Sequence, residues 1–404
     1  MSLGQRDCPV CGATHSFPLV RLEWQLFADH PLLVTTRKAI PEGTLLFGVD
    51  ACTRCGMSFS SPIAPQDAFD AYYSCWSRYA FGTDNLSGPP DKATLERYQG
   101  TAERVAPYIP ASDARILDVG CLEGGLLDTI RTFGHTNIAG VDPAPESMRR
   151  AAQKAIDVRT GTVDAIPFPD GTFDLILCVH VLEHIADLSS LDIFRVLSHR
   201  GRLYIEVPDA ASYQADSPDI YADLSLEHIN HFDLPSLVRL LHSRGFRALE
   251  TGVRTYPAVP GSPAMQDSIW GIFERDITIP EHEIKDPSDP LMLRRYLDES
   301  QRRALKLNAR LEAFVAPNEA FRIWGTGHGA FRLLGFSALR TGVLSAATDI
   351  NPLYWGKRLG GTVVVRPDAF LAGDGKVVVT SAINGQNIAA HLRKQGWKGE
   401  IFVP

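Results

Sequence analysis

The amino-acid sequence predicts an α/β chain built around a doubly wound parallel sheet, and three observations carry that prediction. Short apolar runs alternate with helix-like segments between residues 114 and 207. Two such runs end in glycine-containing turns, at Gly120 and at Gly325, and apolar-periodic segments follow both turns. An aspartate, Asp142, ends a further run. Repeated strand-loop-helix units of this kind place ligand sites at the carboxyl ends of the strands.

The composition is that of an ordinary globular protein with several domains. At about 100 to 200 residues per domain, 404 residues suggest two or three. The net charge of −7 provides no overall basic field, which weighs against a nucleic-acid partner. No apolar run is long enough for a membrane span, and the start MSLGQRDCPVC lacks the apolar segment of a signal peptide. We therefore expect a cytoplasmic protein with no membrane partner.

Two CxxC pairs near the N-terminus predict a structural metal site. Cys8 and Cys11 form one pair, Cys52 and Cys55 form the other, and a glycine follows each pair. Four thiolates with no redox partner favour tetrahedral zinc, although a redox role of the CxxC motifs is the alternative. The long separation of the pairs predicts a hairpin between them. Such a closed site stabilises a small module and performs no metal chemistry.

An aromatic, turn-rich stretch follows the second pair, from Pro62 to Pro90. Its aromatic residues are Phe69, Tyr72, Tyr73, Trp76, Tyr79 and Phe81. They either pack the metal module onto its neighbour or cover a substrate as a lid, since tyrosine combines an apolar face with a hydroxyl. Turn residues between Gly82 and Pro90 mark a boundary. We expect a zinc-binding module with an aromatic lid or linker over residues 1–88.

The segment ARILDVGCLEGGLLDTIR, residues 114–131, predicts a strand, a tight turn and a helix. Glycines let such a turn lie close to a ligand, and the helix start presents unpaired N–H groups. Alone, the turn is compatible with any strand-helix unit of a parallel sheet. Asp142, at the end of the next strand, can accept hydrogen bonds from both hydroxyls of a ribose.

The succession DVGCLEGG, Asp142, PFPDGTFD and VLEH resembles a class I S-adenosylmethionine-dependent methyltransferase, with a core expected over residues 89–280. By that resemblance, the cofactor-binding residues are Asp118, Gly120 and Gly124 around the methionine and ribose parts, Asp142 on the ribose, and Thr162 and Val163 beside the adenine. Two positions depart from the family pattern. Leu122 replaces the middle glycine of DxGxGxG, and Thr162 replaces an acid that is frequent near the adenine.

A polar cluster, EHINHFD at residues 227–233, follows the fifth strand of this core, where a methyl acceptor would lie. His228 is a candidate general base because an ordinary histidine has a pKa of about 6.5, and Glu227 is placed to orient it. His228 and His231 are alternatively metal ligands, or His228 only packs or caps.

The remaining sequence predicts a connecting helix and a second, smaller Rossmann-like domain. Asp289-Pro290 is typical of a helix start, and Pro317 ends the apolar stripe that follows, which gives a helix within residues 281–317. The segments IWGTGHGA, DINPLYWGK and the strand at 376–380 predict the domain over residues 318–404. Because Gly329 is followed by Ala-Phe, we favour a domain without its own cofactor.

The order of these parts resembles the three-domain C-methyltransferases that act on nucleotide-linked deoxysugars. The resemblance implies S-adenosyl-L-methionine and structural zinc as cofactors, and a nucleotide-linked sugar as acceptor. It implies that a histidine matching His228 removes a proton next to a ketone, with Glu227 as the adjacent acid. Further substrate-contact candidates are Tyr72, Tyr73 and His180, together with Ser225 and His231, which stand where the family often has tyrosines.

Other functions stay open at this stage. The chain could methylate oxygen or nitrogen of another natural-product or glycan intermediate, with His228 deprotonating a hydroxyl. A zinc-bearing rRNA methyltransferase and a non-catalytic cofactor-binding scaffold are further alternatives. We expect an enzyme that acts on a small molecule as a monomer or small homo-oligomer, without a nucleic-acid partner.

Overall fold

The computed structural model describes residues 6–26, 43–75, 92–214, 219–257, 265–276 and 287–404. Their strands form three sheets, which contain four, seven and six strands. Trp76, Tyr79, Phe81 and the predicted boundary at residues 82–90 lie outside the described residues. Among the described helices, none is both long and apolar enough to cross a membrane.

The seven-stranded sheet forms the centre of the molecule, in the order β10-β11-β8-β7-β4-β5-β6. Its strands are β4 (Ile116–Val119), β5 (Ile138–Asp142), β6 (Asp157–Thr160), β7 (Phe173–Val179), β8 (Leu197–Pro208), β10 (Phe246–Pro257) and β11 (Met265–Arg275). Strands β8, β7, β4, β5 and β6, which are adjacent in the sheet, run parallel to one another. Strand β11 runs antiparallel to both of its neighbours, β8 and β10. The predicted α/β fold class is therefore confirmed.

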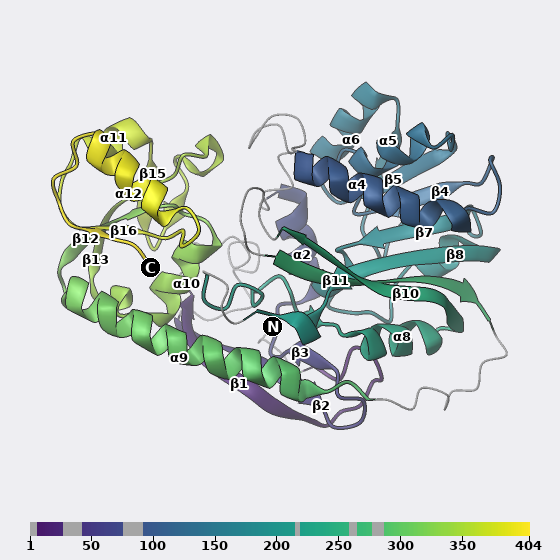
Figure 1. Ribbon diagram of the computed structural model, residues 1–404, viewed down its shortest axis with the longest axis horizontal. Coiled ribbons are helices and arrows are strands. Elements are labelled where there is room, and N and C mark those ends of the chain that lie inside the picture. The colour runs from purple at the N-terminus through teal and green to yellow at the C-terminus, as the bar shows by residue number, and fades with distance from the viewer. Residues whose placement is uncertain (1–5, 27–42, 76–91, 215–218, 258–264, 277–286) are drawn as a thin grey trace.

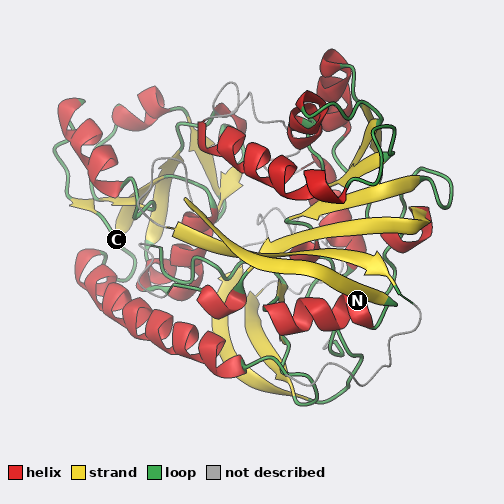
Figure 2. Cartoon of the chain, turned by 45° about the vertical axis from the view of Figure 1, so that its right-hand side comes forward, coloured by secondary structure: helices red, strands yellow, loops and turns green. Residues whose placement is uncertain are grey.

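Helices cover both faces of this sheet, as Figure 2 shows. They are α4 (Lys92–Val105), α5 (Gly125–Thr132), α6 (Pro145–Ala151), α7 (Ile193–Val196) and α8 (Leu234–His242). Successive strand residues point to opposite faces, so Ile116 and Leu117 of β4 belong to different hydrophobic clusters, and both are fully buried. The continuous apolar run that predicted this strand thus reflects burial on both sides.

The four-stranded sheet joins the N-terminal module to the core. Its order is β1 (Ser16–Leu26), β2 (Gly43–Cys52), β3 (Ser58–Ser60) and β9 (Asn230–His231), and helix α2 (Gln66–Cys75) follows β3. The antiparallel β1–β2 pair is the predicted hairpin. The short strand β9 belongs to the EHINHFD segment and pairs with β3. The module and the polar cluster are consequently parts of one sheet.

The long helix α9 (Pro290–Phe314) runs along the lower side of the molecule in Figure 1, from the region of β1 and β2 to the C-terminal domain. The Asp289 side chain accepts a hydrogen bond from the Leu291 N–H at 2.9 Å and caps the helix as expected. The first half of α9 packs through Leu293 and Leu297 on the cluster beneath β1 and β2. Its second half packs through Leu307 and Leu311 on the C-terminal domain.

The six-stranded sheet is a second doubly wound unit, in the order β14-β15-β13-β12-β16-β17. Its strands are β12 (Ala320–Trp324), β13 (Val343–Thr348), β14 (Arg358–Leu359), β15 (Thr362–Val365), β16 (Val377–Val379) and β17 (Ile401–Phe402); its helices are α10 (His328–Phe336), α11 (Pro367–Leu371) and α12 (Gly385–Lys394). All pairs except β14–β15 are parallel. This is the Rossmann-like arrangement expected at the C-terminus.

The C-terminal domain contacts the chain just before the EHINHFD segment. The Arg332 guanidinium donates to the Ala222 carbonyl at 3.1 Å, and the Ala382 N–H donates to Asp219 at 3.3 Å. The rings of Tyr221 and Phe336 meet edge to face. These contacts bring the start of α10 toward the polar cluster.

Candidate active site and metal centre

The turn after β4 has the backbone shape that its glycines predict. Gly120 and Gly124 have φ angles of +73° and +74°, in the left-handed region. A Cβ atom on Gly120 would lie only 2.8 Å from the Val181 side chain. Leu122, which replaces a glycine of the family pattern, also has a positive φ of 50°. The turn therefore keeps its shape at a strain of about 1–2 kcal/mol for this leucine.

Asp142 holds Leu122 in that conformation. One carboxylate oxygen of Asp142 accepts the Leu122 N–H at 2.9 Å, and the other accepts the Ala144 N–H at 2.9 Å. Asp142 is buried, and burial is the largest cause that raises its pKa. The predicted ribose ligand thus sits beside the glycine turn, at the carboxyl end of β5.

Asp118 is a buried acid at the end of β4 and beneath the same turn. Burial, and secondly the charge of Asp142, raise its pKa to about 8. A bound cation would reverse this effect, because an opposite charge favours the ionised carboxylate. The turn is consequently suited to a ligand that carries positive charge, as S-adenosylmethionine does.

The loop after β6 supplies an acid that the sequence analysis missed. The Thr162 hydroxyl donates to the Asp164 carboxylate at 2.5 Å, and Val163 is buried behind them. Asp164 is therefore a further candidate for the acid that the family often has near the adenine. The sequence signal was available, because Asp164 lies within the same polar loop.

Glu227 brings together side chains from all three parts of the chain. The hydroxyls of Tyr72 and Tyr73, on α2, donate to its carboxylate at 2.6 and 3.3 Å. His328, at the start of α10, lies 3.3 Å from the same carboxylate. Burial tends to raise the pKa of Glu227, but His328 and then Tyr72 more than offset it, so that this pKa is lower than usual. Glu227 is therefore ionised at neutral pH.

His328 had no assigned role in the sequence analysis. It lies in the IWGTGHGA segment, whose pattern indicated only a nucleotide-type turn. Its partner Glu227 is about a hundred positions earlier, so no local pattern connects them. The docking of α10 on residues 219–224 creates this contact.

His228 stands beside Glu227 and packs against His184. The two imidazole rings are 4.7 Å apart and meet edge to face. Burial, and secondly His184, lower the pKa of His228 to about 3, so its imidazole is neutral and can accept a proton. His184 is fixed in turn, because its Nδ1 contacts the Glu227 carbonyl at 3.0 Å and the Tyr73 hydroxyl at 2.8 Å.

Glu183, His184 and His228 form a donor set that could hold a metal ion. One ligand atom from each lies within 4.8 Å of the others. Burial tends to raise the pKa of Glu183, but His184 and His180 lower it to about 2. His231 does not belong to this set: it is buried in β9, where its ring meets the Tyr213 hydroxyl at 3.3 Å.

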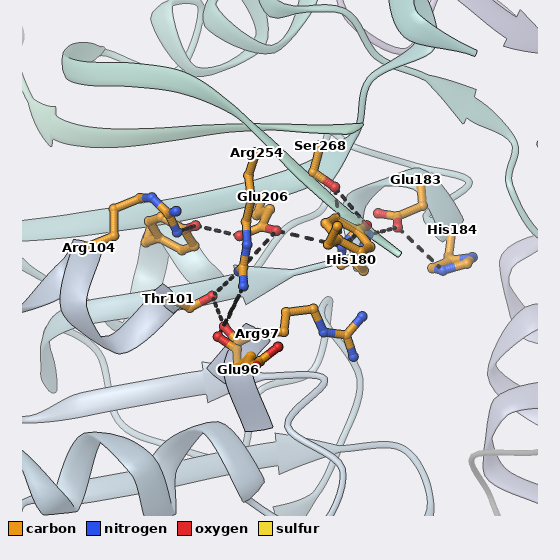
Figure 3. A network of polar contacts seen from close by, with 12 residues as sticks. Glu96, Arg97, Thr101, Arg104, His180, Glu183, His184, Glu206, Arg254 and Ser268 are labelled. Atoms are coloured by element: carbon orange, nitrogen blue, oxygen red, sulfur yellow. Dashed lines mark hydrogen bonds and ion pairs between the residues drawn. The ribbon is translucent and has the colours of Figure 1, made fainter. Parts of the chain in front are cut away.

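His180 belongs to a polar network at the carboxyl ends of β7 and β8 (Figure 3). It follows β7 with a φ of 55° and contacts Glu183 at 3.2 Å. Its other ring nitrogen lies 3.0 Å from the Tyr256 hydroxyl. Farther along, the fully buried Glu206 accepts a hydrogen bond from Tyr204 and lies 3.9 Å from Arg254. The network connects α4 to the surroundings of His184.

Ser225 fixes the turn that carries the Glu227–His228 pair. Its hydroxyl accepts the N–H groups of Glu227 and His228 at 3.2 and 2.9 Å. Its role as a substrate ligand stays a prediction, as does that of His231. In the structure the Ser225 hydroxyl contributes to holding the pair.

The four predicted metal ligands converge at one point of the N-terminal module. Sulfur atoms of Cys8 and Cys55, and of Cys11 and Cys52, are 3.6 Å apart, and all four lie within 4.8 Å. Tetrahedral zinc with bonds of about 2.3 Å requires sulfur separations of about 3.8 Å, so the cluster fits this ion. Gly12 and Gly56 follow the pairs with positive φ angles, as the knuckle turns require.

Because the sulfur atoms are close together, the thiols of the cluster differ in pKa. A hydrogen bond from Cys55 is the largest cause that lowers the pKa of Cys8 to about 5, and burial raises that of Cys11 to about 11. The protein alone therefore favours the thiolate of Cys8 and disfavours that of Cys11. A divalent cation would stabilise all four.

Comparison with known proteins agrees with the fold of the core. The methyltransferase domain family matches residues 92–251, which is less than half of the chain. A ubiquinone biosynthesis O-methyltransferase of Methylocella silvestris is 38% identical over 93 residues, which are 22% of this chain and 36% of that protein. A Mycolicibacterium smegmatis protein named for S-adenosylmethionine-dependent methyl transfer is 27% identical over 160 residues, 39% of this chain and 60% of that protein.

Among solved structures, a Thermotoga maritima S-adenosylmethionine-dependent methyltransferase aligns with a TM-score of 0.36 at 19% identity, over 45% of this chain and 92% of its own. The chain spans between 36% and 60% of the length of the two curated relatives named above.

Two phenylalanine substitutions test the contacts of Glu227. Tyr72→Phe removes the shorter hydrogen bond to a buried charge, so we expect it to lower the free energy of unfolding by about 1.5–3 kcal/mol. Tyr73→Phe is the comparison variant: its contact with Glu227 is long, but it also loses the 2.8 Å contact with His184, so we expect a loss of about 0.5–1.5 kcal/mol. Urea unfolding of the three proteins measures both values. Equal losses would contradict a special role of the Tyr72 bond.

Asp118→Asn tests the raised pKa of this acid. The native pKa of about 8 exceeds the usual 3.8, so the native state holds a proton that the unfolded state releases. Stability of the natural protein should fall as the pH rises from 4 to 8, and the variant should lack this contribution. We expect the variant to be more stable at pH 8 by about 1–3 kcal/mol and nearly equal at pH 4. A difference that does not change with pH would contradict this prediction.

Metal analysis tests the cysteine cluster. We expect about one equivalent of zinc in the purified protein, as four-coordinate structural sites bind one ion. Cys52→Ser should lose the metal and lower the melting temperature, whereas Cys178→Ala, a buried cysteine elsewhere in the core, should retain it. Retention of full zinc by the Cys52 variant would exclude this cluster as the site.

The match of residues 92–251 to the methyltransferase domain family agrees with the methyltransferase fold that the sequence predicted for the core.

Proposed function

We propose that the protein transfers a methyl group from S-adenosylmethionine to a carbon next to a ketone, on a deoxysugar linked to a nucleoside diphosphate. The observation that carries this proposal is the Glu227–His228 pair. A buried ionised carboxylate stands beside a neutral imidazole, and both are fixed by contacts from the module, the core and the C-terminal domain. The pair packs against His184, which follows the end of β7. In the sheet, β7 is the neighbour of β4, the strand that leads into the glycine turn.

The chemistry requires alignment, a base and hydrogen-bond donors. The methyl group on the donor's sulfonium is already electrophilic, so the enzyme mainly has to bring the acceptor in line with it. A carbon acceptor attacks only as an enolate. In the proposed step His228 takes the α-proton, a carbon–carbon bond forms as the sulfur–methyl bond breaks, and S-adenosylhomocysteine leaves. Tyr73 and His180 are the candidate donors to the enolate oxygen.

Glu227 has a defined part in this step. A histidine with a pKa of about 3 is a weak base, because the imidazolium that it forms is largely shielded from water and lies beside His184. The negative charge of Glu227 stabilises that imidazolium as it appears. Glu227 thus acts through His228 and positions it, and the tyrosines and His328 keep Glu227 ionised.

Methylation of an oxygen is the second candidate function. The name of one relative supports O-methylation, since the Methylocella silvestris protein is a ubiquinone biosynthesis O-methyltransferase. The donor set of Glu183, His184 and His228 also favours it, because a cation held there would polarise a hydroxyl. In this function His228 would deprotonate the hydroxyl or hold the cation. For the cysteine cluster we propose structural zinc in either case.

Solvent-deuterium exchange distinguishes carbon from oxygen chemistry. The protein, saturated with S-adenosylhomocysteine, is incubated in deuterated water with a panel of nucleoside diphosphate-linked keto-deoxysugars, and incorporation is followed by mass spectrometry. We expect exchange next to the ketone and its loss, by at least about a hundredfold, in His228→Ala. His199→Ala, an exposed histidine on β8, is the control and should exchange normally.

Two outcomes would overturn parts of the proposal. Retained exchange in the His228 variant would remove this residue as the base. Calorimetry that detects no binding of S-adenosylhomocysteine, or unchanged binding after Asp142→Ala, would count against the assigned donor site.

A further inference from the structure

We propose that Arg6 is a positioning residue, which holds the two chain segments that carry His184 and His228 in their working arrangement. The inference rests on the proposed function, because these histidines belong to the site described there. Arg6 lies just before Cys8 and is partly buried. No local pattern distinguishes it from a surface arginine, so its role follows from the contacts of its guanidinium.

The guanidinium of Arg6 joins three segments that are far apart in the sequence. Its Nε donates to the Ser60 carbonyl and its Nη1 to the Ala186 carbonyl, each at 3.1 Å. Its Nη2 donates to the Ile229 carbonyl at 2.7 Å and to the Asn230 side-chain oxygen at 2.6 Å. Hydrogen bonds from a charged donor are stronger than those between neutral groups. The planar fork of an arginine spans these acceptors, which the compact ammonium group of a lysine cannot do.

Asn230 extends these contacts to the loop that carries His184. Its side-chain oxygen accepts from Arg6, while its Nδ2 donates to the Leu182 and Ile185 carbonyls at 2.7 and 2.8 Å. This pattern fixes the orientation of the amide, because a guanidinium only donates and a carbonyl only accepts. The Asn230 side chain is buried, so these bonds do not compete with water. Arg6 and Asn230 together therefore hold the loop from both of its sides.

The segments that Arg6 joins are the ones whose histidines pack together. His184 lies within residues 182–186, and His228 directly precedes Ile229. The centres of the two imidazole rings are 4.7 Å apart. A shift of either segment would change this separation and the direction of the proposed base. A misplacement of about 1 Å can slow a reaction about a hundredfold, so the position of these segments matters for the chemistry.

A second arginine of the same module provides a matched control. Arg21 forms an ion pair with Asp50 and donates to the Val20 and Val49 carbonyls at 2.9 and 3.3 Å. All of these partners belong to β1 and β2, so Arg21 stabilises the module without contacting the histidine segments. If Arg6 served the stability of the module alone, loss of either arginine would affect the site in the same way.

NMR spectra of the protein with isotope-labelled histidine report on the two rings directly. The signals of His184 and His228 are assigned from the alanine variant of each, and all proteins are compared at equal zinc content. We expect Arg6→Ala to shift both signals, because the two segments are no longer tied together. Arg21→Ala should leave both signals in place, although both alanine variants should lower the melting temperature.

The deuterium-exchange assay supplies a second measurement. We expect Arg6→Ala to lower the maximal exchange rate at least about tenfold, because the base is displaced. The KM of the nucleotide-linked sugar and the Kd of S-adenosylhomocysteine should stay within about twofold, since Arg6 acts on the chemical step alone. Arg6→Lys keeps the charge but not the fork, so it should recover only part of the rate. Arg21→Ala should exchange at the natural rate.

Several results would overturn the inference. Unshifted histidine signals or an unchanged exchange rate in Arg6→Ala would do so, and so would equal changes in the Arg6 and Arg21 variants. If Arg6→Ala does not fold, Arg6→Lys takes its place, and natural histidine signals in that variant would count against the positioning role. A natural protein that exchanges no deuterium would instead refute the proposed carbon chemistry, and the NMR signals would then decide the role of Arg6.

Discussion

The buried carboxylate of Glu227 is the interaction on which the rest of the arrangement depends. A carboxylate removed from water is stable only if charge and hydrogen bonds compensate it. Here the compensation comes from Tyr72 of the N-terminal module and from His328 of the C-terminal domain. Because these two partners lie outside the core, docking of both outer parts contributes to the stability of the buried charge. Docking and the electrostatic state of the site are therefore coupled.

The segment from residue 219 to residue 231 carries this coupling. Its first part receives α10 through Ala222, its middle holds the Glu227–His228 pair on Ser225, and its end forms β9 in the module's sheet. The cysteine cluster belongs to the same module: Cys55 lies shortly before β3, and the cysteines share one hydrophobic cluster with Phe232. A metal bound there would thus act on the site indirectly, by fixing the module that presents α2. This is a structural role, as the closed set of four sulfurs implies.

Local patterns predicted the sheets well because strand runs and glycine turns are encoded in adjacent residues. Examples are the apolar run at 116–119, the hairpin between the two cysteine pairs and the helix cap at Asp289. What the sequence could not show depends on distant partners. Leu122 keeps a left-handed backbone because Asp142, twenty positions on, accepts its N–H. His328 joins the site through Glu227, which folding brings beside it. Likewise, β9 is too short to be recognised without β3 as its partner.

A crystal structure of the complex with S-adenosylhomocysteine tests the central claim most directly. That claim is that donor and acceptor meet in front of the Glu227–His228 pair. The account predicts that the adenosine lies over β5 and β6 and that the sulfur points across the glycine turn toward His180 and His228. A sulfur directed away from this pair, with Glu227 and His228 on the far side of the bound donor, would contradict it.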